Sequence, residues 1–319
     1  MHIIEGLETL DAIDLEHQYG DGLESRSAVC VGVFDGVHLG HLRLIHELVE
    51  LGSQQQAVPA VVTFREHPDQ LLRGKAPPLL VSIEHRLRLL RRAGVGRVLL
   101  LDFDADIRDL SARQFAERVL ARGLRTRGLL LGYDSALGKD RQGNAASFEE
   151  LGKELGFLVR EADKFAVDDV PISSSMIRKA IQEGGLARAH RLLGRWPSAF
   201  GIVIEGDHRG AAMGYPTANL EPQSSVMPPQ GVYAVDVLHD GELHPGVANL
   251  GTRPTFGDGE DRSPLLEVHL LDYNENLYSA TLEIYYRAFL RAERPFATAE
   301  HLRAQISEDV QHARELLMA

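Results

Sequence analysis

Cysteine is almost absent from this sequence of 319 residues, which contains only Cys30. A single cysteine cannot form an internal disulfide, so the chain is not a disulfide-stapled domain, and this usage fits a reducing compartment. Cys30 lies inside an apolar run, where we expect a buried and inert thiol. No apolar run approaches the length of a membrane span, and the N-terminus, MHIIEGLETL, lacks a signal-peptide core. We therefore expect a cytoplasmic protein that does not enter membranes.

The sequence is also short of positive charge: it has 34 basic and 46 acidic residues, so its net charge is −12. That balance argues against a general nucleic-acid-binding surface. The apolar fraction of 44% and the charged fraction of 25% are typical of a globular protein, and the length is enough for about two domains. We expect small-molecule substrates, no nucleic acid, no membrane, and at most weak self-association.

The first half of the chain alternates strand and helix patterns. Short, almost wholly apolar runs occupy residues 28–34, 57–64, 97–103 and 128–132. Strands that are buried on both faces have this composition. Amphipathic helices are predicted at residues 39–51 and 112–121, the second with Ser111 as its N-cap and Gly123 at its end. The alternation predicts an α/β domain with a parallel sheet and right-handed crossovers, over residues 1–185.

The pattern changes after about Gly184, where a short helix is predicted that ends at Gly194. Alternating, strand-like runs then occupy residues 231–238, 265–271 and 278–290, and the first is followed by a turn at Asp240-Gly241. A closing helix over residues 298–317 has Thr298 as its cap. For residues 186–319 we predict a domain that consists of a small antiparallel β-barrel and a terminal helix. The alternative to the barrel is a sandwich.

The stretch VGVFDGVHLGHLRLI, residues 31–45, carries the first candidate site. A strand breaks at Asp35-Gly36, and His38, Gly40 and His41 follow where a helix begins. The glycines allow close approach of a ligand, and a helix N-terminus suits a phosphate. Two histidines would stabilise charge that develops on a phosphoryl group. The alternatives are that the histidines only cap the helix, or that they bind zinc with a distant third ligand.

A second candidate site, at a serine-rich helix start, lies at ISSSMIR, residues 172–178. Three serines precede the predicted helix, and Arg178 lies in its first turns. Hydroxyls, free backbone N–H groups and a guanidinium fork make an anion-binding arrangement that suits the β- and γ-phosphates of ATP. The alternative is an ordinary serine cap with a solvated arginine.

The other dense stretch is EGDHRGAAMGYPTANL, residues 205–220. Gly210 and Gly214 belong to a glycine-rich loop, and Pro216 fixes the turn before Thr217 and Asn219. A hydroxyl and an amide oxygen two residues apart lie on one face of an extended chain. That arrangement suits Mg²⁺ held together with nucleotide phosphates. The alternative is a barrel turn rich in glycine and proline.

These motifs together resemble a known family. GVFDGVHLGH is similar to the HxGH signature of the nucleotidylyltransferase superfamily, and more narrowly to the opening of the FAD synthetase module of bacterial bifunctional riboflavin kinase/FAD synthetases. TFREHP, GYDSALGKDRQG and the segment that begins ISSSMIR follow in the family's order. The second half resembles the riboflavin kinase module through MGYPTANL, GVYAV, GVANLGTRPTF, LLEVHLLDY and the LRAERPF ending. The resemblance spans nearly the whole chain.

The resemblance implies a Rossmann-type nucleotidylyltransferase domain that converts FMN to FAD, and a barrel domain that converts riboflavin to FMN with Mg·ATP. It implies that His38 and His41 are catalytic and that Glu267 is the kinase base, since a neutral hydroxyl must lose its proton. The alternative for Glu267 is a surface glutamate on a strand. The implied ATP and phosphate ligands are Gly32, Phe34, Asp35, Gly40, Asp134, Ser174, Ser175, Arg178, Gly210, Gly214, Thr217 and Asn219. Thr217 and Asn219 would hold Mg²⁺, and Phe64 and Tyr133 would contact the flavin.

The sequence departs from the family at two places. Glu66 stands where the family usually has proline, and Ser135-Ala136-Leu137 stands where it usually has two aromatic residues. Part of the expected flavin platform is therefore missing, so the alternative is a riboflavin kinase whose N-terminal half is weakly active or regulatory. A class I aminoacyl-tRNA synthetase also uses an HxGH-type motif, but it needs a lysine-rich loop where this chain has ISSSMIR.

Overall fold

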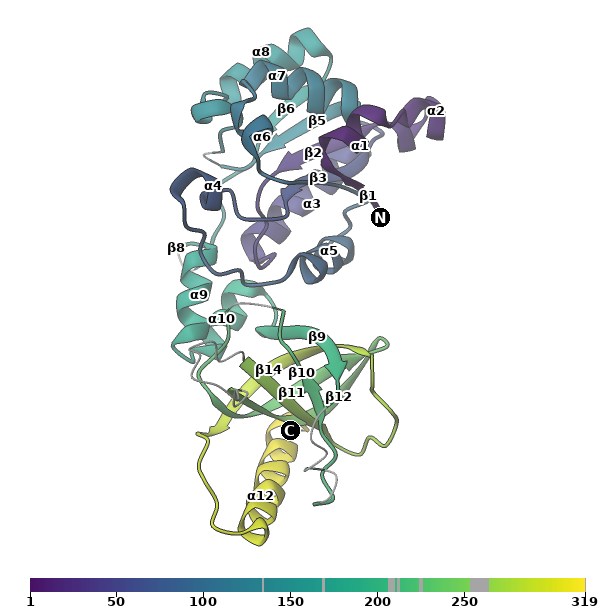
Figure 1. Cartoon of the computed structure of the whole chain (residues 1–319). Coiled ribbons are helices and arrows are strands. Elements are labelled where there is room, and N and C mark those ends of the chain that lie inside the picture. The colour runs from purple at the N-terminus through teal and green to yellow at the C-terminus, as the bar shows by residue number, and fades with distance from the viewer. Residues whose placement is uncertain are drawn as a thin grey trace. The chain divides into compact units, whose positions relative to one another are not determined.

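The computed structural model describes residues 1–133, 135–167, 170–205, 210, 213–223, 226–252 and 264–318. Their contacts divide the chain into two compact units (Figure 1): the first is Met1–Pro78 with Ile83–Ser173, and the second is Leu79–Ser82 with Ser174–Ala319. The functional boundary after residue 185 stays a prediction. Among the described residues, no helix is both long and apolar enough to cross a membrane.

The first unit contains a six-stranded sheet in the order β1-β4-β3-β2-β5-β6. Its strands are β1 (His2–Glu5), β2 (Ser27–Val31), β3 (Val58–Phe64), β4 (Arg97–Leu101), β5 (Thr126–Leu131) and β6 (Leu158–Glu161). Every neighbouring pair is parallel, which confirms the predicted sheet. The chain adds strands on one side of β2 and then on the other, so the strand order reverses between β2 and β5. Ligands of open α/β sheets bind at the carboxyl ends of strands at such a point.

Helices cover both faces of this sheet (Figure 1). They are α1 (Gly6–Ala12), α2 (Leu15–Tyr19), α3 (Leu39–Gln54), α4 (Asp69–Arg73), α5 (Ile83–Arg92), α6 (Ala105–Asp109), α7 (Ala112–Phe115) and α8 (Ala145–Leu155). The helix predicted at 112–121 begins as α7, with a capping box of Ser111 and Gln114, and continues as the π-helix η2 (Ala116–Gly123). Short 3₁₀ turns, η1 (Leu23–Ser25) and η3 (Lys139–Arg141), and the hairpin of β7 (Ala166–Val167) and β8 (Val170–Pro171) complete the unit.

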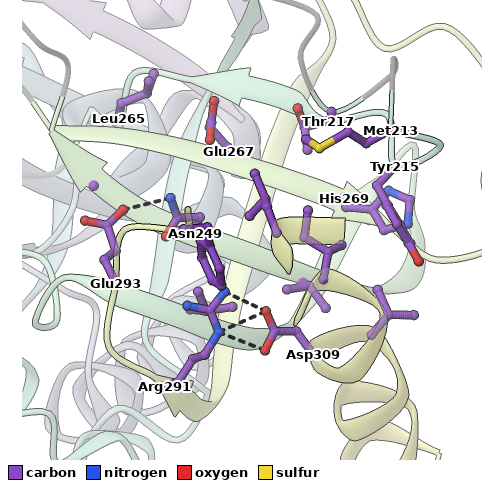
Figure 2. A pocket seen from close by; sticks show the side chains of 18 of the residues that line it. Met213, Tyr215, Thr217, Asn249, Leu265, Glu267, His269, Arg291, Glu293 and Asp309 are labelled. Atoms are coloured by element: carbon purple, nitrogen blue, oxygen red, sulfur yellow. Dashed lines mark hydrogen bonds and ion pairs between the residues drawn. The ribbon is translucent and has the colours of Figure 1, made fainter. Parts of the chain in front are cut away.

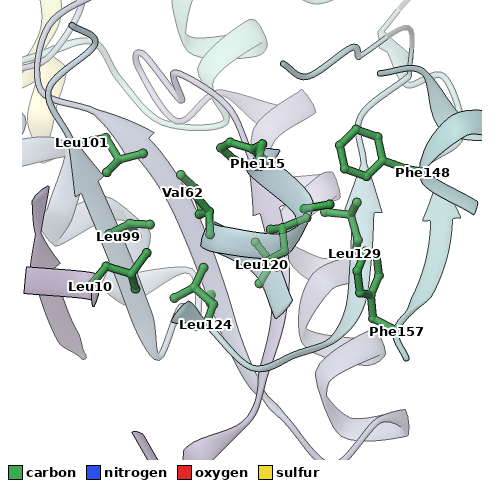
Figure 3. Packing of buried hydrophobic residues seen from close by; sticks show 14 of the residues in the cluster. Leu10, Val62, Leu99, Leu101, Phe115, Leu120, Leu124, Leu129, Phe148 and Phe157 are labelled. Carbon is green, nitrogen blue, oxygen red and sulfur yellow. The ribbon is translucent and has the colours of Figure 1, made fainter. Parts of the chain in front are cut away.

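Two apolar interfaces hold the three layers together. Helix α3 packs on β2, β3 and β5. On the opposite face, side chains of α1, η2 and α8 form a buried cluster with the strands; Figure 3 shows Leu10, Leu120 and Phe148 among them. Cys30 is fully buried in β2, as expected, and burial raises the pKa of its thiol. The apolar strand runs that predicted the sheet are therefore explained by burial on both faces.

The second unit is a closed barrel of six antiparallel strands in the order β10-β13-β12-β11-β14-β9, which decides for the barrel over the sandwich. The strands are β9 (Ser198–Ile204), β10 (Ala218–Leu220), β11 (Gly231–His239), β12 (Glu242–Thr252), β13 (Pro264–Leu270) and β14 (Thr281–Arg291). Helices α9 (Ser174–Gln182) and α10 (Leu186–Leu193) precede them, and α12 (Ala299–Leu317) packs on β11, β12 and β14. The predicted turn is present, since Asp240 and Gly241 have φ of 46° and 90°.

Candidate active sites

The turn between β2 and α3 has an unusual backbone. Phe34, Gly36 and Val37 have φ of 53°, 80° and 38°. Positive φ in a β-branched residue is a steric outlier, and such residues persist where the surrounding structure holds them, often at ligand sites. The turn delivers His38 to the N-cap position of α3 at the carboxyl end of β2.

Three aromatic rings lie together at this helix start. The ring centres of His38 and His41 lie 3.7 Å apart with the rings nearly parallel, at 16°, and the ring centre of Phe34 lies 5.1 Å from that of His41, with the rings tilted by 52°. A Cβ on Gly40 would lie 3.2 Å from the ring of His38, and one on Gly32 would lie 3.1 Å from the ring of Phe34. Both glycines therefore leave room for the rings, which gives the HxGH spacing a physical reason.

His38 also caps the helix, because its Nδ1 accepts a hydrogen bond from the backbone N–H of His41 at 3.3 Å. In a neutral imidazole the proton is then on Nε2, which is a donor. The capping alternative and the phosphate-binding prediction are thus compatible, since the cap fixes the ring. Among the described residues, no group of three histidine, cysteine or acidic side chains could hold a metal ion, so the zinc alternative gains no support.

A buried arginine near this turn was not predicted from the sequence. Arg86 of α5 is fully buried and donates to the carbonyl oxygen of Phe64 at 2.8 Å. Burial lowers the pKa of Arg86, and the nearby charge of Asp35, which is also buried, opposes that shift. Arg86 reads as an ordinary surface position of an amphipathic helix, so no local pattern could have identified it.

The two predicted flavin contacts differ in exposure. Tyr133 follows β5, is 57% exposed, and has the ammonium group of Lys164 5.3 Å from its ring centre. Phe64 is only 9% exposed and packs edge-to-face on Phe103. Tyr133 therefore offers the larger free surface to a planar ligand. Asp134, predicted to place the nucleotide, lies outside the described residues.

The serine-rich segment differs slightly from the prediction, because α9 begins at Ser174 and only Ser173 precedes it. Ser174 and Ser175 occupy the first turn, and Arg178, largely buried, has NH1 3.5 Å from Oγ of Ser175. By its contacts α9 groups with the second unit, so whether it shares a site with His38 stays a prediction.

The second unit has a cavity of about 500 Å³ on the outer face of the barrel. Alternate residues of β12 and β13 face it, including Asn249, Glu267 and His269, while their neighbours Leu250 and Val268 point into the barrel core. Figure 2 shows Glu267 and Thr217 at one side of this cavity and the α12 side at the other. The strand alternation thus places Glu267 in a cavity.

A polar row crosses three neighbouring strands on this wall. In the strand register Glu267 of β13 lies opposite Asn219 of β10 and opposite Asn249 of β12. Thr217 directly precedes β10 and also lines the cavity. The row brings together a carboxylate, two amides and a hydroxyl, which are oxygen ligands of the kind that Mg²⁺ and hydroxyl substrates prefer.

The turn that carries Thr217 is held from several sides. The carbonyl oxygen of Gly210 accepts hydrogen bonds from Met213 and Tyr215 at 3.0 and 2.9 Å, and Gly214 has a φ of 87° that favours glycine. His269 Nδ1 donates to the carbonyl oxygen of Pro216 at 2.8 Å. His269 therefore links the turn that carries Thr217 to β13, the strand that carries Glu267.

Several residues that line this cavity were not predicted. Asn249, Arg291, Glu293, Phe296 and Asp309 all line it. Asn249 donates to Glu293 at 2.8 Å, and Arg291 pairs with Asp309 (Figure 2). The alternation of GVANLGT could have shown that Asn249 shares a face with other outward residues, but the ion pair joins a strand end to a helix, which a one-dimensional pattern does not show.

Comparison with known proteins decides the family. The FAD synthetase family model matches residues 22–176 and the riboflavin kinase model matches residues 193–317. The bifunctional riboflavin kinase/FMN adenylyltransferase of Escherichia coli strain K12 is 37% identical over 301 residues, which is 94% of this chain and 95% of that protein. The chain belongs to this family. The Bacillus subtilis member is 35% identical over 294 residues, 91% of this chain and 92% of that protein.

A solved structure resembles the whole chain. It is the crystal structure of a macrolide-efflux protein from Streptococcus pneumoniae, with a TM-score of 0.79 and 27% identity, and the match covers 98% of this chain and 99% of that one. The α/β and barrel architecture is therefore shared along the full length.

Proposed function

We propose that this member of the family phosphorylates riboflavin to FMN in a C-terminal domain of residues 186–319 and adenylylates FMN to FAD in an N-terminal domain of residues 1–185. The observation that carries the kinase part of the proposal is the polar row of Asn219, Glu267 and Asn249 in a cavity of about 500 Å³. It is supported by the matches of the two family models to successive parts of the chain.

In the kinase reaction, the 5′-hydroxyl of riboflavin attacks the γ-phosphorus of ATP, and ADP leaves. Glu267 takes the hydroxyl proton as the new P–O bond forms, because a neutral hydroxyl is a weak nucleophile. Thr217 and Asn219 would hold Mg²⁺ together with ATP, because their oxygens fit an ion that is usually shared with substrate phosphates. Bound there, Mg²⁺ would supply positive charge that neutralises the phosphates, and Gly210 and Gly214 belong to the neighbouring loop.

In the adenylyl transfer, an ionised phosphate oxygen of FMN attacks the α-phosphorus of ATP, and pyrophosphate leaves. No base is needed, so positioning and charge stabilisation suffice. The stacked rings of His38 and His41 lie at a helix N-terminus and donate toward the α-phosphate, with Gly32, Phe34, Asp35 and Gly40 forming the turn. Ser174, Ser175 and Arg178 hold the leaving pyrophosphate, and Tyr133 supplies the exposed flavin contact.

A pair of variants tests this assignment. Replacing both His38 and His41 with alanine should abolish FAD formation while FMN accumulates, and Glu267→Gln should stop FMN formation while added FMN is still converted to FAD. The products are separated by chromatography, and circular dichroism checks the fold. Loss of FMN formation in the folded double histidine variant contradicts the assignment. A wild-type chain that makes FMN but no FAD favours the reading that the first unit is regulatory.

A further inference from the structure

Two Arg–Asp pairs tie α12 to the barrel, and both are bidentate. The inner pair joins Arg291, at the end of β14, to Asp309, with Nε to Oδ1 at 2.9 Å and NH2 to Oδ2 at 2.8 Å. The outer pair joins Arg314 of α12 to Asp272, which follows β13, with both hydrogen bonds at 2.7 Å. The same helix is thus held by the same chemistry at two places.

The two pairs differ in what surrounds them. The side chains of the inner pair are 21% and 5% exposed, whereas those of the outer pair are 34% and 69% exposed. Arg291 and Asp309 line the cavity, and Arg314 and Asp272 do not. Gln305 also donates to Asp309, at 3.1 Å. Only the inner pair is therefore built into the wall of the substrate cavity.

Among the residues of α12 that line the cavity, Asp309 is the only polar one. Leu302, Ile306 and Val310 of α12 face the cavity at helical spacing, and Val310 is next to Asp309 in the chain. Phe296, in the connection from β14 to α12, lines it too, with the guanidinium of Arg291 5.7 Å from its ring centre. An apolar wall opposite a polar row matches a molecule with a flat ring system at one end and hydroxyls at the other.

The connection between β14 and α12 is itself held. Glu293 accepts a hydrogen bond from the Asn249 amide at 2.8 Å. A Cβ on Gly251 would lie 2.8 Å from the same carboxylate, so Glu293 rests against the backbone of β12. Hydrogen bonds therefore hold the connection to β12 through Glu293, and hold α12 to the end of β14 through Arg291 and Asp309.

We propose that the Arg291–Asp309 pair is a positioning device for flavin binding: it sets the place of α12 so that its apolar face contacts the isoalloxazine ring. The inference rests on the proposed kinase function of this cavity. Neither residue touches the reacting phosphate, so both are positioning residues. Because a planar ring needs close contact along its whole face, a small displacement of the wall weakens flavin binding more than nucleotide binding.

The test compares Asp309→Asn with Asp272→Asn, which removes the same charge from the same kind of pair on the same helix. Riboflavin affinity is measured by the change in flavin fluorescence without ATP, and KM values for riboflavin and ATP are measured in turnover. Asp309→Asn should weaken riboflavin binding about tenfold, the lower end of the effect of losing a hydrogen bond to a charged group. Its KM for riboflavin should rise more than its KM for ATP, and Asp272→Asn should remain within about twofold of wild type.

Arg291→Lys is the second variant, because it keeps the charge and loses only the bidentate fork. It should give an intermediate loss of riboflavin affinity, and it decides the question if thermal unfolding shows that Asp309→Asn does not fold. Equal riboflavin affinities for wild type, Arg291→Lys and Asp309→Asn overturn the proposal, as does an equal loss in Asp272→Asn. Failure of the wild-type protein to make FMN, with riboflavin still bound, contradicts the kinase function instead and leaves the comparison of affinities valid.

Discussion

Replacing Gly40 with alanine separates helix stability from catalysis in the first unit. Gly40 is the second residue of α3, and its substitution adds one methyl group. Alanine favours a helix over glycine by roughly 0.5–1 kcal/mol in helix interiors, and less near the ends. Taken alone, this change should leave the protein as stable as the wild type or slightly more stable.

The added methyl group has a second effect that follows from the geometry. The new Cβ would lie 3.2 Å from both Cε1 and Nδ1 of the His38 ring, which is tighter than ordinary van der Waals contact. The ring must move by a few tenths of an ångström, and it is stacked on His41 at 3.7 Å. Since a misplacement of 1 Å can cost about 10²-fold in rate, we expect FAD formation to fall roughly three- to tenfold.

The assay follows FAD formation from supplied FMN and Mg·ATP, together with the melting temperature. Ser53→Ala is the matched control, because Ser53 is an exposed residue of the same helix and also gains helix propensity. The control should keep full activity. If Gly40→Ala keeps full activity as well, the position of the His38 ring does not limit the reaction. If its melting temperature falls clearly, the lost activity reports unfolding, and the reasoning is refuted in the same experiment.

Three further outcomes are expected. Glu267→Gln should lower the kinase kcat by about 10²–10⁴-fold, measured as FMN formation at saturating substrates; a loss below about threefold would make Glu267 a strand residue only. Ser135→Phe should lower the KM for FMN in FAD formation, and an unchanged KM would mean that this loop is not part of the flavin site. Leu137→Phe should change the melting temperature instead, because Leu137 packs against the core. Burial raises the pKa of Tyr233 to about 12, above its unfolded value of about 10, so its contribution to stability is present below pH ~10 and is lost as pH rises through about 12. Chemical denaturation measures the free energy of unfolding at pH 9 and pH 11.5. Between these two pH values it should fall less for Tyr233→Phe than for wild type, and equal decreases would contradict this.

Patterns with a fixed period predicted most of the fold. The apolar runs at β2, β3, β4 and β5 indicated a buried parallel sheet, and the alternation at β11 and β13 indicated a barrel wall. The edge strands β1 and β6 were missed. β1 has only four residues and runs straight into α1. β6 is likewise short, with its residues half-buried or exposed, so neither has the long apolar run of a central strand.

The local parts of the candidate sites were also predictable, because glycines, histidines and capping residues act over a few positions. His38 caps α3, which was the alternative to phosphate binding for this motif, and the alternation placed Glu267 and His269 on one face. Arg86 and Asp309 were not found, because their roles depend on tertiary neighbours: Asp35 lies in another element from Arg86, and Arg291 in another from Asp309. Such partners become visible only when the strands and helices are packed.

The most direct test of the account is a time course with riboflavin and Mg·ATP as the only substrates, with the flavins and nucleotides separated by chromatography. The account predicts that FMN appears first and FAD follows, with ADP released in the first step and pyrophosphate in the second. The variant with His38 and His41 both replaced by alanine should stop at FMN, and Glu267→Gln should leave riboflavin unconverted. A wild-type protein that forms no FMN, or a histidine variant that still forms FAD at the wild-type rate, would contradict it.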